Sequence, residues 1–216
     1  MWHRLFARLF PSTPLIEVGI SKKALLHNLH TYQAAYPDVL LAPVLKSNAY
    51  GHDLGLIARA LDTEKIAFFM VDSLYEARRL RGAGVRSRIV VMGYVRPQDI
   101  ADSSLRKVDF AVTDIAQLRA LAHTVRSPRR LHIKLDTGMH RQGIQTEDLA
   151  EAIALLKGNA HLHVVGACSH FADADTEGSA HAQRQLTHWR EALAMVTSSF
   201  PSLEYTHFAA TKGVRF

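Results

Sequence analysis

The stretch that decides the fold runs from Val39 to His52 and reads VLLAPVLKSNAYGH. It begins with seven apolar residues, which end at a single lysine, Lys46. An unbroken apolar run is typical of a strand that is buried on both faces of a parallel sheet. Residues 54–61 follow with the apolar spacing of a helix. We therefore expect a buried strand, a polar turn and a helix, with Lys46 at the carboxyl end of the strand.

Lys46 is a candidate nucleophile because of this position. Both α/β barrels and open α/β sheets keep their active sites at the carboxyl ends of the strands. A lysine amine that is desolvated or lies near other cations loses its proton readily and condenses with aldehydes to give a Schiff base. Tyr50 can return to the same place, because Gly51 permits a tight turn. The alternative is a surface lysine after a core strand, which is the commoner case.

Residues 46–52, KSNAYGH, decide between these alternatives. They closely resemble the segment KANAYGH of alanine racemases, which are pyridoxal-phosphate enzymes, and only the second residue differs. The resemblance implies that Lys46 binds the cofactor covalently and that Tyr50 contacts its phosphate. Residues 16–29 also resemble the start of these enzymes, more loosely.

A second motif covers residues 134–143 and reads KLDTGMHRQG. From the residues alone it is a strand-to-helix loop, with Asp136 and Thr137 as turn residues and Gly138 and Gly143 at positive φ. That interpretation does not explain why two cations, Lys134 and Arg141, should meet at the same face. An arginine there can bind a carboxylate through two parallel hydrogen bonds.

This segment resembles the alanine racemase motif K-X-D-T-G-M-X-R-X-G. The resemblance implies that Arg141, together with Met139 of the same motif, binds the substrate. It also implies that Lys134 supports Arg141. The corresponding lysine of the family is often carbamylated.

His170 stands in residues 169–172, SHFA, just after a predicted strand. A lone histidine at a strand end is usually a structural hydrogen-bonding residue. Here the segment resembles the family's Ser/Thr-His-Phe-Ala, which implies that the imidazole lies against the cofactor ring. Lys46, Arg141 and His170 are thus the candidate catalytic residues. Asp173 and Asp175 have no histidine or cysteine at zinc-like spacing, so we expect no metal site.

Residues 207–213, HFAATKG, match the family's His-X-Ala-Asn-Ser only in part. The resemblance implies that His207 lies beside the cofactor and that Thr211 replaces the serine that binds its phosphate. Gly213 leaves backbone N–H groups accessible to a phosphate. Ala210 stands where the family has asparagine, so one cofactor contact is missing from the pattern.

Strand and helix patterns alternate along most of the chain, which predicts a parallel α/β fold with right-handed crossovers. A doubly wound sheet fits this alternation as well as a barrel does. The family resemblance favours a (β/α)8 TIM-type barrel that is incomplete at its last unit. The expected strands are 15–20, 39–45, 66–71, 89–92, 110–112, 131–135, 161–167 and 203–208, and the expected helices are 21–36, 54–61, 73–82, 99–105, 114–121, 148–156 and 179–198.

We expect one barrel domain over residues 15–216, preceded by a helical extension over residues 1–14. The apolar face of that extension either packs on the body or anchors at a membrane interface, and we favour packing. No stretch approaches the roughly 20 apolar residues of a membrane span. Cys168 is the only cysteine, which excludes an intrachain disulfide and favours the cytoplasm.

The chain has a formal charge of +6, with its arginines scattered along the sequence. This distribution favours an anionic ligand and gives no sign of a nucleic-acid-binding module. The resemblance implies the interconversion of L-alanine and D-alanine, which supplies D-alanine for peptidoglycan.

The family uses two bases, a lysine on one face of the cofactor and a tyrosine on the other. That tyrosine comes from a C-terminal β domain and reaches across a dimer, and the sequence as given, which ends at Phe216, shows no counterpart. We therefore expect little racemisation by these 216 residues alone, and a homodimer, because an incomplete barrel exposes strand edges. The alternatives are a non-catalytic pyridoxal-phosphate barrel of the homeostasis type and a degenerate subunit.

Overall fold

The computed structural model describes residues 15–208 and 211–215 of the chain. The chain divides into two compact units, Met1–Asp38 and Val39–Phe216. The helix that the sequence predicts over residues 1–14 lies outside the described residues.

The first unit contains one described helix, α2 (Lys22–Ala35). It begins where the sequence predicts, because Ser21 Oγ accepts the N–H of Ala24 at 3.2 Å. It ends before Pro37, which cannot continue a helix. The strand expected over residues 15–20 is wrong, since this segment has no strand partner and is mostly exposed. An alternating pattern says which side chains can share a face, but a strand also needs a hydrogen-bonded neighbour.

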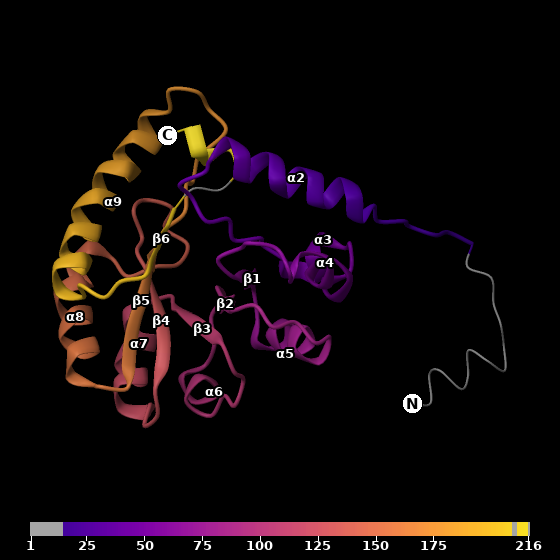
Figure 1. The fold of residues 1–216 in the computed structure, drawn as a ribbon. Coiled ribbons are helices and arrows are strands. Elements are labelled where there is room, and N and C mark those ends of the chain that lie inside the picture. Colours follow the sequence, from indigo (N-terminus) through magenta and orange to yellow (C-terminus); the bar gives the residue numbers. More distant parts are fainter. Residues whose placement is uncertain (1–14, 209–210, 216) are drawn as a thin grey trace. The chain divides into compact units, whose positions relative to one another are not determined.

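The second unit is built on a parallel sheet whose order follows the sequence, β1-β2-β3-β4-β5-β6. A doubly wound sheet would reverse its order at a switch point, so the structure excludes that alternative. Figure 1 shows the strands curling into an open half-barrel, which confirms the incomplete α/β barrel. The strands are β1 (Phe69–Val71), β2 (Ile89–Val91), β3 (Val108–Val112), β4 (Arg129–Lys134), β5 (Leu162–Cys168) and β6 (Tyr205–His207).

Helices connect these strands, and successive helices pack against one another, α4 on α5, α6 on α7, α7 on α8 and α8 on α9. Side-chain caps begin four of them, at Asp53, Ser73, Asp114 and Ser179, close to the helix starts that the sequence predicts. The helices are α3 (Lys46–Tyr50), α4 (Leu54–Leu61), α5 (Leu74–Gly82), α6 (Pro97–Ala101), α7 (Ile115–Thr124), α8 (Leu149–Gly158) and α9 (Ala180–Ser199), with the 3-10 turns η1 (Thr146–Asp148) and η2 (Gly213–Arg215).

Residues 39–45 differ from the prediction. They run beside β1 with strand-like hydrogen bonds, but only Val44 forms a bridge, to Met70. They are not buried on both faces, since Val39 and Leu40 are 58% and 52% exposed. The segment has one neighbour in the sheet of the second unit, and Pro43 has no N–H to donate, which is typical of an edge position.

The concave side of the sheet is filled by aromatic and imidazole rings. Phe68 lies just before β1, His132 lies in β4 and Tyr205 lies in β6, and their ring centroids are 5.1–6.0 Å apart. Gly166 makes room for them, because a Cβ at this position would lie 2.2 Å from His132 Nδ1. The β4–β5 register shifts between Leu131 and His132, at the same level.

We expect Ser73→Ala to lower the free energy of unfolding by about 1 kcal/mol, because Ser73 Oγ caps α5 by accepting the N–H of Glu76 at 3.2 Å. Urea denaturation of the variant measures this loss. Arg78→Ala, at an exposed position of the same helix, is the control and should change the stability by less than about 0.5 kcal/mol. An equal effect of the two substitutions would contradict the assignment of the cap.

Candidate active site

Lys46 lies at the carboxyl end of the sheet, as the sequence predicts. The N–H of Leu45 donates to the carbonyl of Met70 in β1 at 2.7 Å. This hydrogen bond fixes where Lys46, the next residue, lies along the direction of β1. The side chain of Lys46 is half-buried. In a parallel α/β barrel the carboxyl ends of all strands lie on one side. Lys46 is therefore on the same side of the sheet as the loops that follow the other strands.

The polar turn after Lys46 is a left-handed turn, which the sequence does not predict. Ser47, Asn48 and Ala49 have φ of 54°, 56° and 53°, and Tyr50 follows at 55°. Gly51, at φ 90°, ends the turn, as expected. Tyr50 itself is 60% exposed, so its assignment as a phosphate ligand remains a prediction.

Lys134 is the last residue of β4, and its Nζ donates to Gln142 Oε1 at 3.2 Å. Burial lowers the pKa of this ammonium, and the positive charges of Arg141 and Lys46 lower it further. Arg141 and Lys46 therefore each lie within electrostatic reach of Lys134. The cationic corner that the sequence predicts at this face is present.

Asp136 organises the loop that carries Arg141. Its Oδ1 accepts three backbone N–H groups at 3.0 Å, from Gly138, Met139 and His140. Burial alone would raise the pKa of this carboxyl, but the donated hydrogen bonds hold it below its usual range. Gly138 and the later Gly143 have φ of 126° and 140°, which confirms the prediction of positive φ.

His170 follows β5 and is half-buried. Burial lowers the pKa of its imidazole, and Arg141, Lys134 and Lys46 lower it further, so the ring is neutral near pH 7. The structure therefore brings the three candidate catalytic residues into one electrostatic cluster with Lys134.

Gln185 of α9 connects two loops of the site, and sequence reasoning missed it. Its Nε2 donates to the carbonyl of His170 at 3.0 Å and lies 3.4 Å from Thr137 Oγ1, while its Oε1 accepts the N–H of Ala172 at 2.9 Å. The side chain is fully buried. A glutamine on the buried face of an amphipathic helix was the available signal.

His207 ends β6 and pairs with a second buried imidazole, since its Nε2 lies 3.0 Å from His132 Nδ1. Burial, and then the charges of His132 and Lys134, lower the pKa of His207 to about 3. Beyond it, His132 Nε2 lies 3.5 Å from Asp109 Oδ2. The sequence analysis did not single out His132 or Asp109. The signal for Asp109 was a polar residue inside the otherwise apolar strand β3, and the signal for His132 was its place between Leu131 and Ile133 in β4.

For the remaining predicted site residues the structure gives mainly their burial and the segment in which they lie. Met139 is half-buried in the Asp136 loop, Thr211 is exposed, and Gly213 is buried in η2. Residues 209–210 lie outside the described residues, so the predicted phosphate contacts of Thr211 and Gly213 stay predictions. Cys168, the last residue of β5, is buried beside Lys134, and burial raises the pKa of its thiol to about 12.

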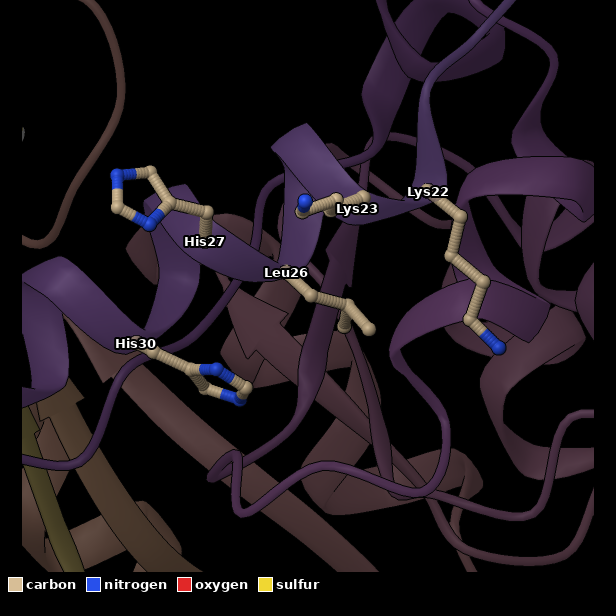
Figure 2. A pocket seen from close by; sticks show the side chains of 5 residues that line it. All are labelled: Lys22, Lys23, Leu26, His27 and His30. Carbon is tan, nitrogen blue, oxygen red and sulfur yellow. The ribbon is translucent and has the colours of Figure 1, made fainter.

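Two surface hollows elsewhere carry no comparable cluster. One lies along α2 and is lined by side chains of that helix alone, with Lys22 and His27 pointing away from each other (Figure 2). The other lies at the amino ends of β2 to β4, the end of a barrel that usually serves stability. Its arginines are already engaged, Arg88 and Arg130 by Asp109 and Arg129 by backbone carbonyls.

Within the described residues, no group of histidine, cysteine, aspartate or glutamate side chains has the arrangement of a metal site. None of the described helices has both the length and the apolar character that a membrane span requires.

Comparisons with known proteins agree with this geometry. A model of the family described as "Alanine racemase, N-terminal domain" matches residues 20–216. Similar curated proteins include the alanine racemases of Staphylococcus carnosus, 31% identical over 199 residues, and Syntrophobacter fumaroxidans, 34% identical over 185 residues. These matches cover 90% and 84% of this chain but 50% and 49% of the relatives. The chain therefore spans about half the length of the curated relatives that it matches.

Solved structures show the same likeness. Alanine racemase from Bacillus anthracis with bound L-Ala-P is 27% identical with a TM-score of 0.82, covering 90% of this chain and 52% of that chain. Histidine racemase from Leuconostoc mesenteroides is also 27% identical, with a TM-score of 0.79, covering 89% of this chain and 52% of that chain.

Proposed function

The chain belongs to the alanine racemase family, and from this premise we propose that it binds pyridoxal 5′-phosphate through Lys46 and acts on a small amino acid, alanine first. The observation that carries the proposal is the electrostatic cluster of Lys46, Lys134, Arg141 and His170.

The residues present fit this cofactor. Pyridoxal phosphate needs an amine for its aldehyde and positive charge for its phosphate, and the half-buried Lys46 lies beside two further cations. Arg141 is exposed and forms no ion pair with any residue in the described ranges. Its guanidinium is thus open to a substrate carboxylate, as the resemblance implies.

When bound, the cofactor supplies an electron sink that stabilises the carbanion left by loss of the Cα proton. The protein contributes positions and proton transfer. The amine of Lys46 takes or returns the Cα proton on one face of the substrate. Arg141 orients the carboxylate, and His170, kept neutral, provides a ring that adds no competing charge.

Three further parts of the proposal follow the family resemblance. The second base comes from a tyrosine of a partner subunit in a homodimer, the product is D-alanine for peptidoglycan, and the protein acts in the cytoplasm. The likeness to a histidine racemase makes histidine the alternative substrate. Because we expect little racemisation by these 216 residues alone, the test is exchange of the Cα proton, which needs only the base on Lys46. Incubating the protein and cofactor with L-alanine and L-histidine in parallel in D2O, and measuring deuterium at each Cα, distinguishes the two.

Lys46→Arg tests the cofactor directly. Arginine keeps the positive charge but does not condense with an aldehyde, so we expect the variant to lose the borohydride-stable adduct on residue 46 completely. Peptide mass spectrometry after reduction with pyridoxal phosphate measures this adduct. Lys23→Arg, at an exposed position of α2, is the matched control and should retain it. An adduct spread evenly over the lysines of the wild-type protein would refute the proposal.

A further inference from the structure

Glu76 is a buried carboxylate that the proposed chemistry does not use. It lies in the first turn of α5 and is 8% exposed. Its Oε1 accepts the N–H of Asn48 at 3.1 Å, and its Oε2 accepts the N–H of Asp72 at 2.9 Å. One side chain therefore joins the turn after Lys46 to the residue that follows β1. Figure 1 shows α5 next to α3 and α4.

The turn that Glu76 holds is strained. Four successive non-glycine residues, 47–50, have φ between 53° and 56°. Left-handed backbone costs roughly 1–2 kcal/mol for each such residue, and asparagine tolerates it best. The conformation persists only if surrounding groups hold it. Asn48 is the point at which they do, since its Oδ1 also accepts the N–H of Leu54 at 3.1 Å and lies 3.3 Å from Arg79 Nη1.

The charge of Glu76 has no cationic partner within salt-bridge distance among the described residues. A buried carboxylate satisfied only by backbone N–H groups is a costly way to stabilise a fold. It does provide two acceptor atoms on one short arm, and a glutamine provides only one. The geometry therefore suits a clasp between two backbone segments.

Lys46 stands in the chain between two residues, Leu45 and Asn48, whose backbone N–H groups are both hydrogen-bonded. On one side its backbone is fixed by the hydrogen bond from Leu45 to Met70, and on the other by the Glu76 contact to Asn48. We propose that Glu76 is a positioning residue, which holds the left-handed turn so that the amine of Lys46 stays directed into the carboxyl-end site. The proposal rests on the function proposed above, in which that amine binds the cofactor.

Glu76→Gln is the test, because the glutamine amide can accept only one of the two N–H groups. Asp62→Asn is the matched control. Asp62 is also a carboxylate that accepts loop N–H groups, from Arg86 at 2.8 Å and Ser87 at 2.9 Å, but it does not touch the turn. The first measurement is the rate at which Lys46 forms the borohydride-trapped adduct at limiting pyridoxal phosphate.

The second measurement needs no cofactor. It is trace acetylation of Lys46 relative to Lys23 in cofactor-free protein, read by mass spectrometry. For Glu76→Gln we expect adduct formation on Lys46 to slow about tenfold and acetylation of Lys46 to rise about threefold or more as the turn loosens. Asp62→Asn should leave both at the wild-type level.

Equal effects of Glu76→Gln and Asp62→Asn would overturn the proposal, because general destabilisation would then explain them. Unchanged acetylation and adduct formation in Glu76→Gln would overturn it as well. If the wild-type protein forms no adduct on Lys46, the proposed function fails. The acetylation ratio then decides the role of Glu76 by itself, a rise in Glu76→Gln alone supporting the clasp and an unchanged ratio overturning it.

Discussion

Replacing Gly143 by alanine is expected to lower the free energy of unfolding of the barrel unit by about 3–5 kcal/mol. Gly143 has φ of 140°, which L-residues rarely adopt. An added Cβ would lie 2.4 Å from the backbone N of Asp136 and 2.8 Å from the carbonyl carbon of Leu135. Backbone atoms cannot rotate away as a side chain does, and the N–H of Gly143 is itself bound to the carbonyl of Thr113 at 2.6 Å. The loop must therefore open.

Opening this loop also displaces the site, because Arg141 lies between Gly143 and the Asp136 turn. Urea denaturation measures the stability, and the Kd for an amino-acid carboxylate measures the displacement. Gly158→Ala is the matched control, since Gly158 ends α8 and a Cβ there meets nothing within 4 Å. It should be neutral or slightly stabilising. A loss below about 1 kcal/mol in Gly143→Ala would show that the loop accommodates a Cβ by shifting.

The parts of the fold that could be predicted depend on local chemistry. Ser73, Asp114 and Ser179 are caps whose partners lie three residues on, so the helix starts could be found from the sequence. The site motifs were found for a similar reason, because Lys46 and Arg141 each stand inside a short and specific run of residues. The alternation of strands and helices predicted a parallel sheet, and the family resemblance favoured a barrel over the doubly wound order, which the observed strand order then excluded.

The parts that could not be predicted depend on partners far away in the sequence. Glu76 meets a residue 28 positions earlier, Gln185 one 48 positions earlier, and His132 one 75 positions later. No local pattern specifies such pairs. The same limit explains the error at residues 39–45, because hydrophobicity shows which side chains can be buried but not how many neighbours the backbone has.

The second large effect concerns pH. Stability should fall by about 2 kcal/mol between pH 7.5 and pH 5 through His207 alone. The pKa of His207 is lowered to about 3 in the folded protein, whereas the unfolded chain titrates near its ordinary value of 6.5. Between these values the unfolded state binds one proton more, so acid favours unfolding. Above pH 6.5 His207 is neutral in both states and does not lower the free energy of unfolding. Below pH 6.5 that free energy falls by about 1.4 kcal/mol per pH unit until the pH approaches 3.

Urea denaturation at pH 7.5, 6 and 5 measures this slope in the wild-type protein and in His207→Gln. Glutamine can still bind His132 Nδ1, so the variant should keep most of the packing and lose about 2 kcal/mol of the pH dependence. His163→Gln, at an exposed position of β5, is the control and should keep the wild-type slope. The groups that face His207 are His132 and Lys134, and both oppose its protonation. If His207→Gln retained the full slope, the acid sensitivity would belong to another group, with His170, whose pKa is also lowered, as the next one to replace.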